Sequence, residues 1–402
     1  MIDENSLILT LIVIVSIITI VRGKLYITRP DVYISIIALV SFVLPQFYMN
    51  KSINWQTSLV FLVGYFAFLL PFVVKSKSTI KYKKLFLFNF KINNRLNLFS
   101  KIYFPLILIL IYFAMKFRIN NSVGLPGVES SMKFSGVFYY ILTTGFFVFI
   151  SSYFLFVQKH NKGKLLFMIM LFSYAFYQST LGWRQGVFDV ILLMVILSYN
   201  LKVKLTMTFK LVTVSVLLGV ITLVVQLQNI FRGSEKTLIH TWERLFGIRY
   251  LDSVVGYFVN KTDNDLWFND YSYLKLKESN LNSADFHNFI ILGGNEDFIN
   301  GAARTGFGSV FMLFGIIGVF FVFFLLGYYY KKLHLYYLMY KDNTFFTLFY
   351  SFNIIILQRI LVEQFDYGVI IHYLSFVCFT YIVFRIYRVI GLKKIKIHAF
   401  NH

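Results

Sequence analysis

Residues 305–329, TGFGSVFMLFGIIGVFFVFFLLGYY, form an apolar run that contains no charged side chain. A helix needs about twenty consecutive apolar residues to cross the hydrocarbon core of a bilayer. The run is therefore predicted to be a transmembrane span, and the rest of the chain repeats the pattern. By this criterion the chain is an all-α polytopic membrane protein with about eleven spans, within a range of ten to twelve: 6–21, 32–49, 55–74, 99–115, 135–157, 165–182, 187–200, 211–229, 305–329, 345–361 and 368–387.

The overall composition agrees with a membrane protein. The mean hydropathy is +0.68, and only 14% of the residues are charged, whereas soluble domains carry roughly 25%. The first apolar run follows Asp3 and Glu4 rather than a basic segment, which predicts a true span and not a cleaved signal. The single cysteine, Cys378, excludes an intrachain disulfide.

The basic residues predict the orientation. Of the 39 Lys and Arg residues, 25 fall in alternate connections between spans and in the C-terminal tail, so the positive-inside rule places these segments in the cytoplasm. The N-terminus then lies outside and the C-terminus inside. Because the formal charge of +21 is spread over many loops and forms no continuous stripe, no nucleic acid partner is expected.

One long segment departs from the apolar pattern. Residues 231–304 contain ten of the 18 acidic residues and two of the four tryptophans. The chain is thus predicted to have three parts: 1–229 with spans one to eight, a large external loop at 230–304, and 305–402 with spans nine to eleven and a basic cytoplasmic tail.

The external side is rich in arginine. Arg184 lies in the tight loop Gly182–Gly186, three arginines lie in the first third of the large loop, and one precedes the ninth span; together they are Arg184, Arg232, Arg244, Arg249 and Arg304. Guanidinium is planar, always charged and presents paired donors, so it suits diphosphate oxygens. A helix N-terminus after Arg304 would add to this preference. Each arginine taken singly is more typical of an interfacial residue paired with an acid or a lipid headgroup, whereas the five together favour anion binding.

Residues 236–259, KTLIHTWERLFGIRYLDSVVGYFV, are predicted to form an amphipathic helix on the membrane or against the bundle. His240, Glu243 and Asp252 are the candidate general bases in it, because a carboxylate or imidazole can take a proton from an attacking hydroxyl. The sequence does not choose among them. A purely structural interfacial helix fits the same pattern.

Several cofactor motifs are missing. The chain has no phosphate-loop motif, no H-E-x-x-H and no Cys/His cluster. The D-x-D pattern at Asp263–Asp265 is common by chance, and its loop faces away from any nucleotide-sugar pool. We therefore expect a metal-independent protein without a cofactor, whose substrate must carry its own chemical energy.

Taken together, three features resemble the bacterial O-antigen and capsular polysaccharide polymerases (Wzy-type oligosaccharide repeat unit polymerases). These features are the R-x-G element at Arg184–Gly186, the large late external loop that begins near Arg232, and the glycine-punctuated helix that follows it. The resemblance covers the layout of the whole chain, while its local motifs are loose.

The resemblance implies a GT-C-like helical bundle in the bacterial inner membrane, similar to O-antigen ligases. It implies transfer of a growing glycan from undecaprenyl diphosphate to a lipid-linked repeat unit on the outer face, with a chain-length regulator as a possible partner. Arg184, Arg232 and Arg304, followed by Arg244 and Arg249, would hold the diphosphate.

Two alternatives stay open. An O-antigen ligase shares the fold and the donor but transfers glycan to the lipid A core. A lipid-linked oligosaccharide flippase or other transporter would require midplane charges and repeated halves, and the sequence shows neither.

Overall fold

A computed structural model describes residues 4–24, 26, 28–48, 53–74, 153–154, 157, 163–180, 192–197, 251–252, 254–256, 259, 305–340, 344–362, 374 and 378. The chain divides into two compact units, one made of 1–91 and 187–366 and the other of 92–186 and 367–402. Within the described residues every regular element is helical. The predicted spans 99–115 and 211–229 lie outside the described residues.

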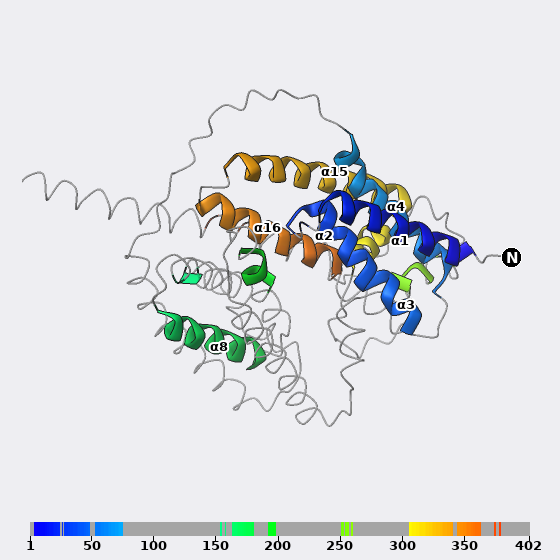
Figure 1. Cartoon of the computed structure of the whole chain (residues 1–402). Coiled ribbons are helices and arrows are strands. Elements are labelled where there is room, and N and C mark those ends of the chain that lie inside the picture. The colour runs from blue at the N-terminus through cyan, green and yellow to red at the C-terminus, as the bar shows by residue number, and fades with distance from the viewer. Residues whose placement is uncertain are drawn as a thin grey trace, which may run out of the picture. The chain divides into compact units, whose positions relative to one another are not determined.

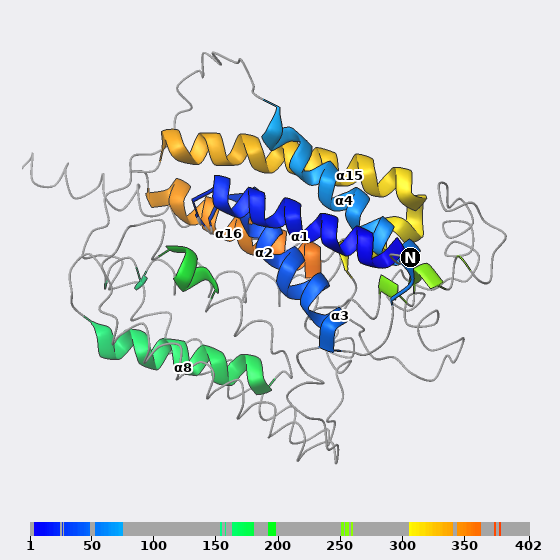
Figure 2. The ribbon, with the colours of Figure 1, turned by 45° about the vertical axis from the view of Figure 1, so that its right-hand side comes forward.

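The first unit contains a set of long helices that lie side by side in both ribbon views (Figures 1 and 2). They are α1 (Glu4–Arg22), α2 (Pro30–Ile37), which continues through the π-helix η1 (Ala38–Val43) into α3 (Leu44–Tyr48), α4 (Trp55–Val73), α15 (Gly306–Met339) and α16 (Thr344–Val362). Pro30 is the first residue of α2, where a backbone N–H would have no hydrogen-bond partner within the helix, so proline is well tolerated there. The apolar runs predicted from the sequence are thus helices here.

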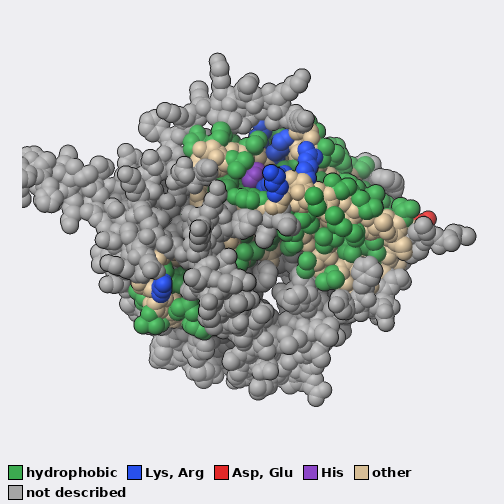
Figure 3. Space-filling view, viewed as in Figure 1, with side chains coloured by type: hydrophobic (Ala, Val, Ile, Leu, Met, Phe, Trp, Pro, Cys, Tyr) green, Lys and Arg blue, Asp and Glu red, His purple; other side chains and the backbone are tan. Residues whose placement is uncertain are grey.

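Among the described helices, α1, α4 and α15 are each long and apolar enough to cross a membrane. The outward side of α1 is apolar along its length, with Leu7, Ile17, Ile18 and Val21 more than half exposed. Figure 3 shows how much of the described surface consists of hydrophobic side chains. The described part therefore has the character of a helical membrane protein, as predicted, while the count of eleven spans and a GT-C-like bundle stay predictions.

Helix α15 reverses direction at Gly315. This residue has φ 67° and ψ −167°, a conformation open essentially only to glycine. The rings of Phe307 and Phe323 stack with centroids 4.1 Å apart, although sixteen residues of straight helix would separate them by about 24 Å. Residues 306–314 therefore fold back, as a short arm, along residues 316–339.

This reversal differs from the single straight span predicted at 305–329. The segment of membrane-crossing length is 316–339, which extends for about 36 Å at 1.5 Å per residue. The arm at 306–314 is too short to cross a bilayer and runs in the opposite direction. A run of apolar residues predicts burial, but it carries no information about a reversal at one glycine inside it.

A close approach between α4 and α15 holds the arm in place. A Cβ atom on Gly64 would lie 2.6 Å from Cε1 of Phe307 and 2.8 Å from Cγ1 of Val319. The absence of a side chain on Gly64 thus lets one turn of α4 contact both limbs of the reversed helix. Phe61, one turn earlier, adds a ring contact to Phe307 with centroids 4.7 Å apart.

Buried hydrogen bonds tie the helices together between their apolar surfaces. The Tyr65 hydroxyl of α4 bonds to Ser16 of α1 at 2.9 Å and to Ser35 of α2 at 2.8 Å. Tyr33 of α2 donates to Gln358 of α16 at 3.1 Å. Interhelical bonds of this kind add to packing in membrane bundles, where apolar surface alone gives helices little reason to associate.

In the second unit the structure describes α8 (Lys164–Thr180), which coincides with the predicted span 165–182. Phe167 packs against Phe154 with ring centroids 5.5 Å apart, and the Tyr153 hydroxyl donates to the Gly163 carbonyl at 3.4 Å. Residues 153–154 therefore pack against the start of α8.

Candidate functional site

Asp252 is the one predicted site residue that lies in the described part of the chain. The other candidates lie outside the described residues: Arg184, Arg232, His240, Glu243, Arg244, Arg249 and Arg304. The site must therefore be built from Asp252 and from the described residues near it.

Asp252 caps the N-terminus of α4. Its Oδ1 accepts a hydrogen bond from the Asn54 backbone N–H at 3.1 Å and another from the Thr57 hydroxyl at 2.8 Å. Asn54, at the N-cap position, makes no side-chain cap of its own. A carboxylate at a helix N-terminus satisfies unpaired donors and meets the positive end of the helix dipole. Asp252 thus holds its own segment of the chain against the first turn of α4.

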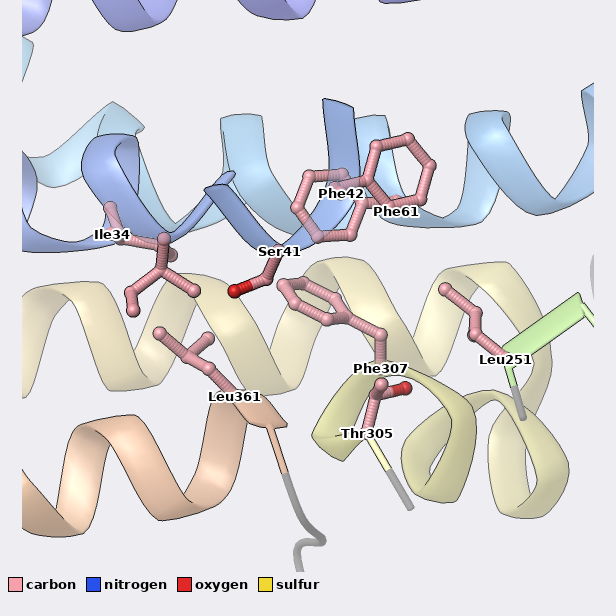
Figure 4. Close-up of a pocket in the computed structure, with 9 residues that line it drawn as sticks. Ile34, Ser41, Phe42, Phe61, Leu251, Thr305, Phe307 and Leu361 are labelled. Atoms are coloured by element: carbon pink, nitrogen blue, oxygen red, sulfur yellow. The ribbon is translucent and has the colours of Figure 1, made fainter. Parts of the chain in front are cut away.

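The neighbouring residue, Leu251, lines a small cavity. The cavity has a volume of about 20 Å³, which is room for about one water-sized group. We call it the Ser41 cavity. It is drawn in Figure 4 and is lined by Ile34, Ile37, Ser41, Phe42, Phe61, Leu251, Thr305, Phe307 and Leu361.

Ser41 is the unusual residue of this lining. It is only 6% exposed, and its hydroxyl has no hydrogen-bond partner. Figure 4 shows that hydroxyl pointing into the space between Ile34, Phe307 and Leu361. A buried hydroxyl without a partner costs about 1–3 kcal/mol, so its presence here needs a reason.

Several other helical hydroxyls in the described residues avoid this cost by bonding back to the carbonyl four residues earlier. Ser35 donates to Asp31 O at 2.8 Å, Ser351 donates to Thr347 O at 2.7 Å, and Thr19 donates to Val15 O at 2.8 Å. Ser41 lies within the π-helix Ala38–Val43, where the regular four-residue spacing is lost. The widened turn leaves the Ser41 hydroxyl directed at the cavity.

The N-terminus of the arm meets the same cavity. Thr305 is the N-cap, and its hydroxyl accepts the Gly308 N–H at 3.0 Å. The contact between Phe307 and Phe61 places the start of the arm six residues into α4, about 9 Å from the first residue of that helix. The arm therefore begins inside the bundle and not at its surface.

A second polar cluster lies at the opposite end of these helices, which we call the Arg29 end. Arg29 pairs with the buried Asp31, with one contact of 3.1 Å from Nε and a second of 2.5 Å from Nη2. Tyr350 donates to the Thr28 carbonyl and bonds to His334 Nδ1 at 2.7 Å. Figure 3 shows Lys and Arg side chains gathered beside a histidine on the surface.

Apart from the local Arg29–Asp31 pair, the bonds named at the Arg29 end join different segments of the chain. Lys331 of α15, for instance, donates to the carbonyls of Pro71 and Val74 at 2.6 and 2.7 Å, where α4 ends. The Thr28 hydroxyl is buried there without a partner, but Thr28 does not line the Ser41 cavity. We therefore interpret the Arg29 end as structural and the Ser41 cavity as the candidate site.

Sequence reasoning missed the Ser41 cavity. The glycines at 306, 308, 315 and 318 are an unusual feature of the run, but the sequence alone does not show that the helix reverses at Gly315. The amino-acid sequence around Ser41 does not distinguish a π-helix from an α-helix. Comparison with protein-family models, curated proteins and solved structures finds no match to this chain.

Proposed function

We propose that this protein is a metal-independent glycosyltransferase that polymerises lipid-linked oligosaccharide repeat units into O-antigen or capsular polysaccharide. The observation that carries the proposal is a set of five arginines, Arg184, Arg232, Arg244, Arg249 and Arg304, in segments that the sequence predicts to be external. Such a set suits the diphosphate of a polyprenyl-linked glycan better than a neutral solute. The proposal includes an inner-membrane location, an external large loop and a GT-C-like bundle.

Chain connectivity supports a common position for two of these arginines. Arg249 precedes Leu251 by two residues, and Arg304 directly precedes Thr305. Leu251 and Thr305 line one cavity, and consecutive Cα atoms are about 3.8 Å apart. Residues 249 and 304, some fifty residues apart in sequence, are therefore each within two positions along the chain of a residue that lines this cavity. Two long cationic side chains at such positions suit one diphosphate.

The proposed reaction needs no cofactor. A hydroxyl of the acceptor repeat unit attacks the anomeric carbon of the donor glycan, the new glycosidic C–O bond forms, and the bond to the diphosphate oxygen breaks. The arginines stabilise the charge that develops on the leaving diphosphate. A general base takes the proton of the attacking hydroxyl.

The three candidate bases are not equivalent. Asp252 Oδ1 already accepts two hydrogen bonds from the start of α4, which gives this side chain a structural task. His240 and Glu243 are therefore the candidates that we would test first as bases. Asp252 is more important for holding the loop against the bundle.

The test is a complementation experiment in a deletion strain. We expect Arg184→Ala and Arg232→Ala to abolish long-chain polymer on a gel of surface polysaccharide, leaving single repeat units on the lipid A core. Arg22→Ala is the matched control, because Arg22 is an exposed arginine at the last turn of α1. Loss of all repeat units in the deletion strain would indicate a ligase instead. Intact long-chain polymer in both external variants would overturn the diphosphate assignment.

A further inference from the structure

The Ser41 cavity combines two features that arise independently. One is a buried hydroxyl that the π-helix leaves without a partner. The other is the N-terminus of the arm, capped by Thr305, which begins inside the bundle and lines the same cavity. Either feature alone would be a local irregularity. Together they place a hydrogen-bond donor and the positive end of a helix at one small space.

Membrane physics restricts where such an arrangement is tolerated. A non-helical backbone at membrane depth persists only where it is buried in protein or lines a cavity. In secondary transporters with discontinuous helices, the N-termini of the half-helices point at anionic groups of the substrate. The arm of 306–314 is a short segment of this kind, and Thr305 at its start is 5% exposed.

The size of the cavity limits what can enter. A volume of about 20 Å³ accepts one oxygen-sized group. The walls around it are mainly apolar, with Ile34, Phe42, Phe307 and Leu361 among them. A group that enters is therefore no larger than one oxygen, which is either a water or an oxygen projecting from a larger molecule that lies outside the cavity.

The groups that face the cavity determine whether the bound oxygen is anionic or neutral. The hydroxyl of Ser41 can donate to an acceptor, and the arm adds the partial positive charge of a helix N-terminus. An anionic oxygen fits these donors better than a neutral hydroxyl does.

We propose that Ser41 donates a hydrogen bond to one phosphate oxygen of a phosphorylated lipid, at the N-terminus of the arm. The assignment of a lipid as the source rests on the proposed function. The position itself rests on the cavity, the π-helix and the reversal at Gly315. Ser41 is then a positioning residue, which sets how deeply the phosphate sits between the helices.

The experiment measures binding to the purified full-length chain in detergent micelles by isothermal titration calorimetry. Farnesyl diphosphate is the probe, farnesol tests the need for phosphate, and inorganic diphosphate tests the need for the lipid chain. We expect Ser41→Ala to weaken farnesyl diphosphate binding about ten-fold, because a hydrogen bond to a charged group is lost. We expect farnesol to bind equally weakly to both proteins.

Ser351→Ala is the matched control. Ser351 is also a fully buried serine in a helix, but its hydroxyl donates to Thr347 O. We expect this variant to bind farnesyl diphosphate as the unmodified chain does. Removal of an unpartnered hydroxyl should not lower the melting temperature of the Ser41→Ala protein, so a loss of binding cannot be attributed to unfolding.

Equal affinity of the Ser41→Ala and unmodified proteins for farnesyl diphosphate would overturn the proposal. Farnesol binding that depends on Ser41 as strongly would also overturn it, because the site would then take a neutral oxygen. If inorganic diphosphate binds with the same Ser41 dependence and equal affinity, the phosphate chemistry stands but the lipid source is wrong. None of these readouts requires polymer formation, so failure of the polymerase proposal would be seen separately.

Discussion

The reversal of α15 predicts an unusual sensitivity to Gly315→Ala. The native φ of 67° and ψ of −167° at this position lie in a region that is essentially restricted to glycine. Forcing an alanine into it costs about 1–3 kcal/mol. If the variant relaxes instead to a straight helix, that strain is relieved, but the stacked pair of Phe307 and Phe323 separates, which costs ~0.5–1.5 kcal/mol in addition to the loss of its buried area. We therefore expect a loss of about 1–3 kcal/mol where the reversal is kept.

Two assays check this prediction. Thermal unfolding of the purified protein, followed by tryptophan fluorescence, should show a lower melting temperature for Gly315→Ala. Gly308→Ala is the control, because its added Cβ would lie 3.2 Å from Thr305 Oγ1 and 3.5 Å from Leu251 Cδ1, without a left-handed φ. We expect that variant to change stability by less than about 1 kcal/mol.

The second assay tests the geometry directly. In a Cys378→Ser background, cysteines at 307 and 323 should crosslink with a short bifunctional thiol reagent, because the native rings lie 4.1 Å apart. The Gly315→Ala change should reduce that crosslink. A Gly315→Ala protein that melts like the unmodified chain, together with no crosslink between 307 and 323, would refute the reversal.

Two further predictions concern the contacts around the arm. Gly64→Ala should lower stability by about 1–3 kcal/mol, measured by the same thermal unfolding, because its Cβ would overlap Phe307 and Val319; an unchanged melting temperature would contradict the close packing of α4 on both limbs. Asp252→Ala should cost about 1–2 kcal/mol through loss of the α4 cap, whereas Asp252→Asn keeps an oxygen acceptor and should retain polymer formation in cells. Loss of polymer in a stably folded Asp252→Asn protein would instead make the carboxylate a participant in the reaction.

The sequence predicted those features of the structure that depend on neighbouring residues, and it did not predict those that depend on contacts between residues far apart in the chain. The position of α1 and the length of α4 follow from local apolar runs, and both helices were predicted close to their observed bounds. The end of α15 was placed ten residues early, at 329 and not at Met339. Its final turns contain tyrosine and lysine, so hydropathy ends there although the helix continues.

The site was harder to predict, because it depends on contacts between distant parts of the chain. Asp252 could be named as a functional candidate from its residue type and its side of the membrane. Its contact with Thr57 joins residues 195 positions apart, and no local pattern encodes that pairing. Ser41 carried no signal at all, since its importance comes from a π-helix and from an arm that folds back from residue 315.

The reversal at Gly315 and the unpartnered Ser41 hydroxyl both cost folding free energy, and this cost is the best reason to begin experiments at the Ser41 cavity. A straight α15 and a regular α-helix through Ser41 would require no glycine-only conformation and no unpartnered hydroxyl. Departures from local preference that persist together in one place are expected at functional sites, where the surrounding structure holds them. Gly315, the π-helix and Ser41 are three such departures, and two of them face one cavity. If that cavity held no ligand, the Ser41→Ala protein would be more stable and equally active, and the three departures would need another physical cause.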